Sequence, residues 1–104
     1  MRIFAYALAL LILAAGSASA KEIQVTMKGM KYNPDKIVAK RGDVLVLVND
    51  DTVAHDAFVS TFGHGINPGG IKPGETKRIA LMKRGKFVVE CVFHDTMKIH
   101  VTVQ

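Results

Sequence analysis

Short runs of alternating apolar and polar residues, separated by glycine, proline and aspartate turns, fill the chain after residue 20. Ile23, Val25 and Met27 alternate with polar neighbours, which is the period of a strand with one buried face. Residues 44–48 are apolar on both faces and predict a central strand. Many short strands between turns indicate an all-β protein, and we expect a Greek-key β-sandwich of about seven to eight strands.

Turn-forming residues set the expected limits of these strands. Turns are predicted at residues 32–35, 41–43, 49–51 and 83–86, and residues 60–74 are predicted to form one long glycine- and proline-rich loop. Near the end of the chain, Phe87, Val89 and Cys91 share one face of a strand. Ile99, Val101 and Val103 share one face of the last strand, which is expected to begin near Lys98.

The first residues have the layout of a secretory signal peptide. A short positive start at Arg2 precedes an apolar run over residues 3–15, and Ala18 and Ala20 form a small-residue cleavage signal. That run is too short to span a bilayer comfortably, and no second long apolar run follows. We therefore expect residues 1–20 to be removed on export to the periplasm, leaving one domain over residues 21–104 with no membrane span. An uncleaved membrane anchor is the alternative.

The basic character of the chain says little about partners. The formal net charge is +5, and the lysines and arginines lie in several separate turns. Because export would remove the protein from nucleic acid, we do not expect it to bind DNA or RNA. Most of these charges are expected to form a solvated surface, and we expect a monomer.

The single cysteine is the most informative residue for function. Cys91 has no partner for a disulfide within its own chain, so it is either a small buried hydrophobe or a metal ligand. His94 and Met97 follow it in a Cys-x2-His-x2-Met run, which favours the metal. Thiolate, imidazole and thioether are soft ligands that suit copper, and one further histidine would complete a His2Cys set with a weak axial Met.

His55 is the expected fourth member of this set. It lies in the predicted loop after residues 44–48, and in a sandwich the ends of that strand and of the Cys91 strand can meet at one pole. The loop over residues 92–97 is short enough to bring His94 and Met97 to the point that Cys91 reaches. His64 and His100 are expected to be solvent-exposed. Met27, Met30 and Met82 are expected to pack in the core.

These residues resemble the cupredoxin family of small blue copper proteins, and most closely its amicyanin-like and plastocyanin-like members. The resemblance covers most of residues 21–104 and rests on the copper-ligand spacing together with several turn motifs: 30–32, 41–44, Asn49, 73–75 and 85–87. It implies one type 1 copper ion, with His55, Cys91 and His94 as strong ligands and Met97 as the long axial ligand.

The resemblance implies electron transfer and no enzymatic activity. A type 1 site cycles between Cu(I) and Cu(II) with little change in geometry, and no acid–base pair accompanies the ligands. The expected partners are redox proteins, a dehydrogenase or a c-type cytochrome, that dock briefly near His94 on a small apolar patch. The alternatives are a periplasmic protein that buffers or delivers copper, and a secreted interaction module without a metal.

One departure from the family suggests a way to tune the copper. Cupredoxins usually carry Asn after the first histidine ligand, and here Asp56 follows His55. If Asp56 is ionised near the copper, it stabilises Cu(II) and lowers the reduction potential. The alternative is that Asp56 and Asp95 both point into solvent.

Overall fold

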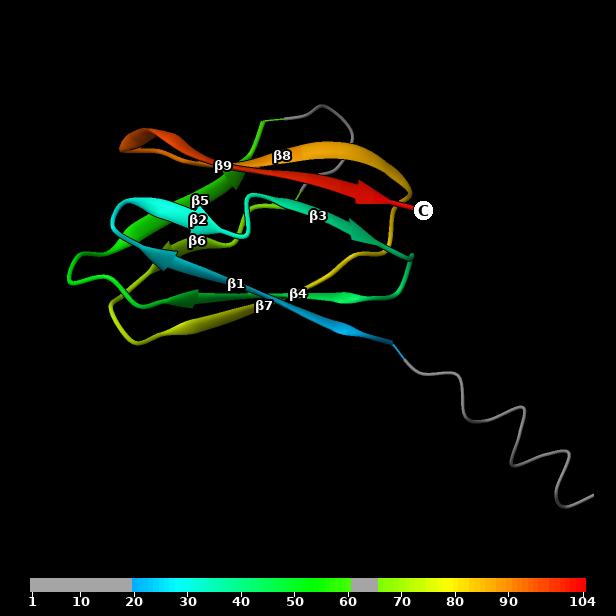
Figure 1. The fold of residues 1–104 in the computed structure, drawn as a ribbon, viewed down its shortest axis with the longest axis horizontal. Helices are drawn as coiled ribbons and strands as arrows, with labels where there is room; N and C mark the ends of the chain where they lie inside the picture. Colours follow the sequence, from blue (N-terminus) through cyan, green and yellow to red (C-terminus); the bar gives the residue numbers. More distant parts are fainter. Residues whose placement is uncertain (1–19, 61–65) are drawn as a thin grey trace, which may run out of the picture.

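Two β-sheets pack face to face in the computed structural model, which describes residues 20–60 and 66–104 (Figure 1). The nine strands of the described residues are β1 Glu22–Lys28, β2 Lys31–Asn33, β3 Lys36–Ala39, β4 Val44–Asn49, β5 His55–Val59, β6 Gly69–Ile71, β7 Thr76–Ala80, β8 Gly85–Cys91 and β9 His94–Val103. The predicted all-β sandwich is confirmed, with slightly more strands than expected.

The first sheet has the order β2-β1-β4-β7. β4 lies between a parallel neighbour, β1, and an antiparallel neighbour, β7. Leu45 and Leu47 are fully buried, and Val46, on the other face of the strand, is buried as well. This burial on both faces explains why residues 44–48 are apolar throughout, and it confirms the predicted central strand.

The second sheet has the order β3-β9-β8-β5-β6 and carries the functional residues. β8 and β9 form an antiparallel hairpin whose register runs from Gly85 opposite Val103 to Cys91 opposite His94, with an irregularity between Glu90 and Cys91. β5 pairs with the other side of β8, so that Ala57 lies opposite Cys91. Three strand ends therefore meet at one end of this sheet.

The core lies between the two sheets and follows the alternation of the strands. Phe87, Val89 and Cys91 are buried together, as are Ile99, Val101 and Val103, which confirms both predicted faces. Met27 is also fully buried, as expected. Met30 and Met82 are 40% and 64% exposed, so their predicted place in the core was wrong. Both lie outside the strands, where no alternation directs a side chain inward.

Several strands begin earlier, or occur where a turn or loop was predicted. β9 begins at His94 instead of near Lys98, because only Val92 and Phe93 form the turn after β8. Tyr32 and Asn33 belong to β2, which the hairpin turn at Gly29 and Met30 folds back onto β1. The glycine-rich stretch contains β6, because small residues can still pair with β5 at the edge of a sheet. His64 lies outside the described residues.

A hydrogen-bonded turn closes the end of the sandwich opposite the strand ends that carry Cys91 and His55. The Asp43 carboxylate accepts hydrogen bonds from the backbone N–H groups of Lys40, at 2.9 Å, and Lys21, at 3.0 Å. These two bonds, first that from Lys40, lower the pKa of Asp43 below its ordinary value. The carboxylate thereby ties the start of β1 to the turn between β3 and β4.

The described residues include no helix able to cross a membrane.

Asp43 is expected to make the fold sensitive to acid. A lowered pKa in the folded state means that the ionised carboxylate contributes stability above its unfolded pKa of about 4, and that this contribution is lost as the pH falls through the folded pKa. We expect Asp43→Asn to be less stable than the wild type at pH 7 and to lose less stability between neutral and acid pH. Urea denaturation of the metal-free proteins at several pH values measures this. Parallel curves for the two proteins would contradict it.

Candidate metal centre

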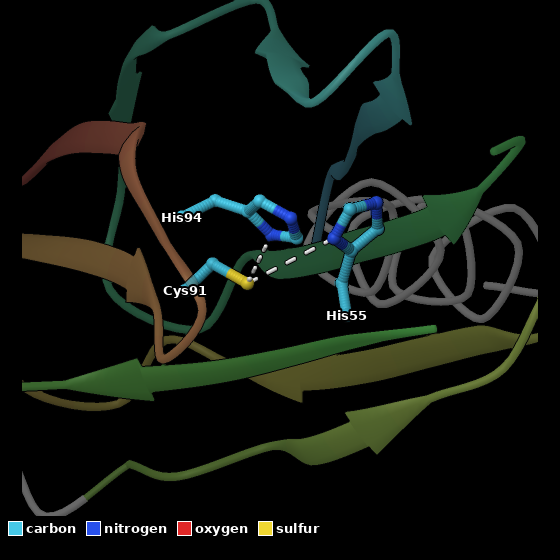
Figure 2. Close-up of side chains that lie close together, drawn as sticks. All are labelled: His55, Cys91 and His94. Atoms are coloured by element: carbon cyan, nitrogen blue, oxygen red, sulfur yellow. Dashed lines mark hydrogen bonds between the residues drawn. The ribbon is translucent and has the colours of Figure 1, made fainter. Parts of the chain in front are cut away.

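Three side chains from two parts of the chain converge at the end of the second sheet. His55 opens β5, Cys91 ends β8 and His94 opens β9, and Figure 2 shows all three pointing toward one another. One ligand atom from each lies within 4.8 Å of the others. His55 and Cys91 are buried and His94 is half-buried. The predicted meeting of these residues is confirmed, although His55 lies in a strand and not in the expected loop.

The distances between the ligand atoms fit a single metal ion. The Cys91 Sγ lies 3.5 Å from His94 Nδ1 and 3.8 Å from His55 Nδ1. Metal–sulfur and metal–nitrogen bonds of about 2.3 and 2.0 Å, as at zinc, separate the two ligand atoms by about 3.5 to 3.7 Å at tetrahedral to trigonal angles. The two imidazole rings meet edge to face, with centroids 5.2 Å apart. Both Nδ1 atoms therefore face the thiol at spacings that one ion can bridge.

Met97, the fourth predicted ligand, is a core residue of β9. It is fully buried and belongs to the same hydrophobic cluster as Cys91. Along β9 it shares its parity with the buried residues Ile99 and Val101, whereas His94 at the start of the strand is half-buried. His55, Cys91 and His94, together with Met97, form the pattern of a type 1 copper site.

The backbone holds the two ligand-bearing regions together. Val92 N–H donates a hydrogen bond to the carbonyl of Asp56 at 2.9 Å, which joins the β8–β9 turn to the residue after His55. Cys91 and His94 lie directly opposite each other in the β8–β9 ladder. Since these contacts involve the main chain, the relative positions of the three ligands are set by the sheet itself.

Asn49 organises the loop between β4 and His55. Its side chain is almost fully buried, and its Nδ2 donates to the carbonyls of Val53, at 2.9 Å, and Ile71, at 2.8 Å. Its Oδ1 accepts from Asp51 N–H at 2.9 Å. All of the side chain's polar atoms are thus used, and they join β4, β6 and the loop that leads to the first ligand.

Asp51 is a functional residue that the sequence did not reveal. Its Oδ2 lies 2.7 Å from Nε2 of His55, the ring nitrogen that faces away from Cys91. The sequence placed Asp51 in a turn-forming Asn-Asp-Asp run, where an acidic residue has no special meaning. Asp51 lies four residues before His55, and on a helix this spacing would bring the two side chains together. Because the segment between them is a loop, the spacing does not predict a contact.

The environment of Asp51 favours its ionised form. Burial by itself raises the pKa of this carboxyl, but hydrogen bonds from His55, Gly29 and Met30 outweigh burial and lower the pKa below its ordinary value. The backbone N–H groups of Gly29 and Met30 donate to it at 2.6 and 3.2 Å. The ring of His55 therefore faces a carboxylate that is itself held in place.

Two other predicted features lie around the site. Asp56 is half-buried and lies between the buried residues His55 and Ala57, so it projects to the opposite face of β5. Asp95 is exposed. The Tyr32 hydroxyl donates to the carbonyl of Glu90, the residue before Cys91, at 3.1 Å. Burial, followed by the charge of Cys91, raises the pKa of Tyr32 and keeps the phenol protonated.

Comparison with known proteins agrees with the fold. A family model described as the cupredoxin-like domain matches residues 1–103. The chain belongs to this family. No curated protein matches the chain in sequence.

Solved structures with the same fold include an amicyanin, a purple cupredoxin and part of a copper-containing nitrite reductase. A reduced amicyanin variant superposes with a TM-score of 0.73 at 23% identity, covering 88% of this chain and 89% of that one. A purple cupredoxin from Nitrosopumilus maritimus gives 0.70 at 19% identity, covering 78% and 98%. A copper-containing nitrite reductase from Thermus scotoductus gives 0.72 at 26% identity, but the match spans 80% of this chain and 22% of that much longer one.

Replacing Asn49 is expected to loosen the loop that positions His55 and Asp51. Asn49→Ala leaves the buried carbonyl of Ile71 and the partly buried carbonyl of Val53 without their donor; the loss at a buried carbonyl costs about 1–3 kcal/mol, and the loss at a partly buried one costs less. We expect the free energy of unfolding of the metal-free protein to fall by about 2–4 kcal/mol in urea denaturation. Asn33→Ala, at an exposed position of β2, is the control and should change it by less than about 0.5 kcal/mol. Equal effects of the two variants would contradict the role assigned to Asn49.

Proposed function

We propose that this protein is an exported electron carrier with one type 1 copper ion. The observation that carries the proposal is the convergence of a buried thiol and two imidazole Nδ1 atoms within 4.8 Å at the end of a sheet. His55, Cys91 and His94 are the proposed strong ligands. Met97, buried in the core, is the proposed weak axial ligand.

The ligand set suits one-electron transfer. Copper in such a site cycles between Cu(I) and Cu(II), and a weak thioether ligand favours Cu(I) and raises the potential. His55 and Cys91 lie in hydrogen-bonded strands, and the main-chain bond from Val92 to Asp56 joins their regions. Ligands that move little between oxidation states lower the reorganisation that electron transfer requires. The four proposed ligands would fill the coordination sphere, which favours a carrier over an enzyme with substrate chemistry of its own.

An exposed apolar surface near His94 is the proposed docking site for redox partners. Phe93 and Val92, in the turn before His94, are 73% and 52% exposed. Val53, in the loop before His55, and Met30 are 39% and 40% exposed. His94 is half-buried and connects this surface to the thiol. A small apolar contact of this kind supports the brief, weak binding that a carrier needs, and a dehydrogenase or a c-type cytochrome is the proposed partner class.

The position of Lys21, at the end of the sandwich opposite the proposed ligands, supports the proposed removal of residues 1–20 on export. We propose cleavage after Ala20, which would make Lys21 N an α-ammonium group. That nitrogen lies 3.0 Å from the Asp43 carboxylate, so the new charge would fall beside an opposite one. The mature protein would then act in the periplasm as a monomer over residues 21–104.

Copper loading tests the function directly. The purified protein is expected to take up one equivalent of Cu(II), to show an intense visible thiolate-to-copper band, and to cycle reversibly in voltammetry. Cys91→Ser should abolish the band, and Met97→Leu should keep it with a changed potential. Binding of copper without reversible cycling would instead favour copper buffering or delivery. If no copper were bound, both proposals would be wrong.

Partner docking is tested at Phe93. Phe93→Ser removes the most exposed apolar side chain beside His94, and we expect the second-order rate constant for electron exchange with a c-type cytochrome to fall about three- to tenfold. The visible spectrum and potential should stay unchanged. Met82→Ser is the matched control, because Met82 is 64% exposed and lies outside this surface. A rate loss of the same size in both variants would exclude a specific docking role for Phe93.

A further inference from the structure

The two ring nitrogens of His55 face different groups. Nδ1 points to Cys91 Sγ at 3.8 Å, and Nε2 lies 2.7 Å from the carboxylate oxygen of Asp51. The His55 side chain is fully buried and that of Asp51 is 11% exposed. In such a setting the ring nitrogen that carries the proton donates a hydrogen bond to the carboxylate, and the other nitrogen keeps its lone pair for a metal.

The Asp51 carboxylate is itself held by the tip of the β1–β2 hairpin. The successive backbone N–H groups of Gly29 and Met30 donate to its two oxygens, at 2.6 and 3.2 Å. Both residues have positive φ, 61° and 57°, and Met30 is the one non-glycine residue of the described chain with this conformation. Adjacent amides in this conformation make a concavity that binds an anion. The left-handed backbone at Met30, which is unfavourable for a residue with a side chain, thus occurs where an amide is needed to hold the carboxylate.

A chain of hydrogen bonds thus runs from the first sheet to the proposed metal. It begins at the hairpin tip, passes through Asp51 and ends at Nε2 of His55, whose other ring nitrogen, Nδ1, faces Cys91. Asn49 also holds Asp51, because the Oδ1 of Asn49 accepts a hydrogen bond from the backbone N–H of Asp51. Asp51 consequently has little freedom to turn away from the ring.

We propose that Asp51 is a positioning residue that fixes the His55 ring with Nδ1 toward the metal and sets the reduction potential of the copper. This inference rests on the proposed copper site. The carboxylate accepts a hydrogen bond from Nε2–H and makes Nδ1 a more electron-rich ligand, and its negative charge favours Cu(II) over Cu(I). The role that the sequence suggested for Asp56 thus belongs to Asp51, since Asp56 projects to the opposite face of β5.

The first test needs no copper and no variant. In the metal-free wild-type protein, nitrogen-detected NMR of the His55 ring should show the proton on Nε2. That proton should resonate downfield and exchange slowly, as expected for a buried hydrogen bond to a carboxylate. In Asp51→Ala the same signal should move upfield and exchange faster. A ring protonated on Nδ1 alone in the wild type would overturn the inference.

The second test measures the potential of two isoelectronic variants. Asp51→Asn removes the charge and keeps one oxygen as an acceptor. We expect it to raise the ratio of Cu(I) to Cu(II) affinity about tenfold, which raises the reduction potential by about 59 mV. Asp56→Asn makes the same change in charge on the opposite face of β5, and its shift should be less than a third as large. The visible band should persist in both variants.

The outcomes separate this inference from the function on which it rests. If both variants bind copper and shift equally, the effect is general electrostatics and the positioning role is refuted. If Asp51→Asn binds copper with an unchanged potential, the tuning role is refuted while the electron carrier stands. If the wild type binds no copper, the proposed function fails and the redox part of the inference fails with it. The NMR measurement then still decides the hydrogen bond to His55.

Discussion

The functional end of this protein depends on the tight turn that joins β8 to β9. Only Val92 and Phe93 separate the two strands, so Cys91 and His94 lie opposite each other in the same ladder. A longer turn would leave the second ligand on a loop with its own freedom. Here the same main-chain pairing that builds the sheet brings a buried thiol and an imidazole to 3.5 Å. β5, paired with β8 on its other side, adds His55 from a third strand of the same sheet.

Polar groups buried under this end connect it to the rest of the sandwich. Asn49 belongs to the first sheet and donates to a carbonyl of β6 in the second, and Asp51 joins the β1–β2 hairpin to His55. Each of these side chains has partners for its buried polar atoms, which is the condition under which a buried network stabilises one arrangement and not several. The ligand end is thus rigid because it is tied to both sheets, and that rigidity suits a site whose proposed task is to change charge without changing shape.

The two ends of the sandwich carry different kinds of side chains. Exposed apolar residues gather in the turns next to His94, whereas Lys40, Lys21 and Asp43 close the other end. A partner docked at the proposed surface would meet the half-buried histidine, whose Nδ1 lies 3.5 Å from the buried thiol.

The sequence by itself determined the sandwich, its central strand and the metal-binding set. Alternation of apolar residues reports which face of a strand is buried, and the close spacing of Cys91 and His94 makes their meeting almost a local property of the chain. The tertiary structure alone decided the limits of β9, the strand within the glycine-rich stretch, and the exposure of Met30 and Met82. It also decided which carboxylate meets the first ligand. Asp56 is the neighbour of His55 in sequence, but alternation along β5 turns it away, while Asp51 reaches the ring because the hairpin tip and Asn49 hold the intervening loop. Contacts that depend on the path of a loop between two sheets leave no periodic signal in the residues that make them.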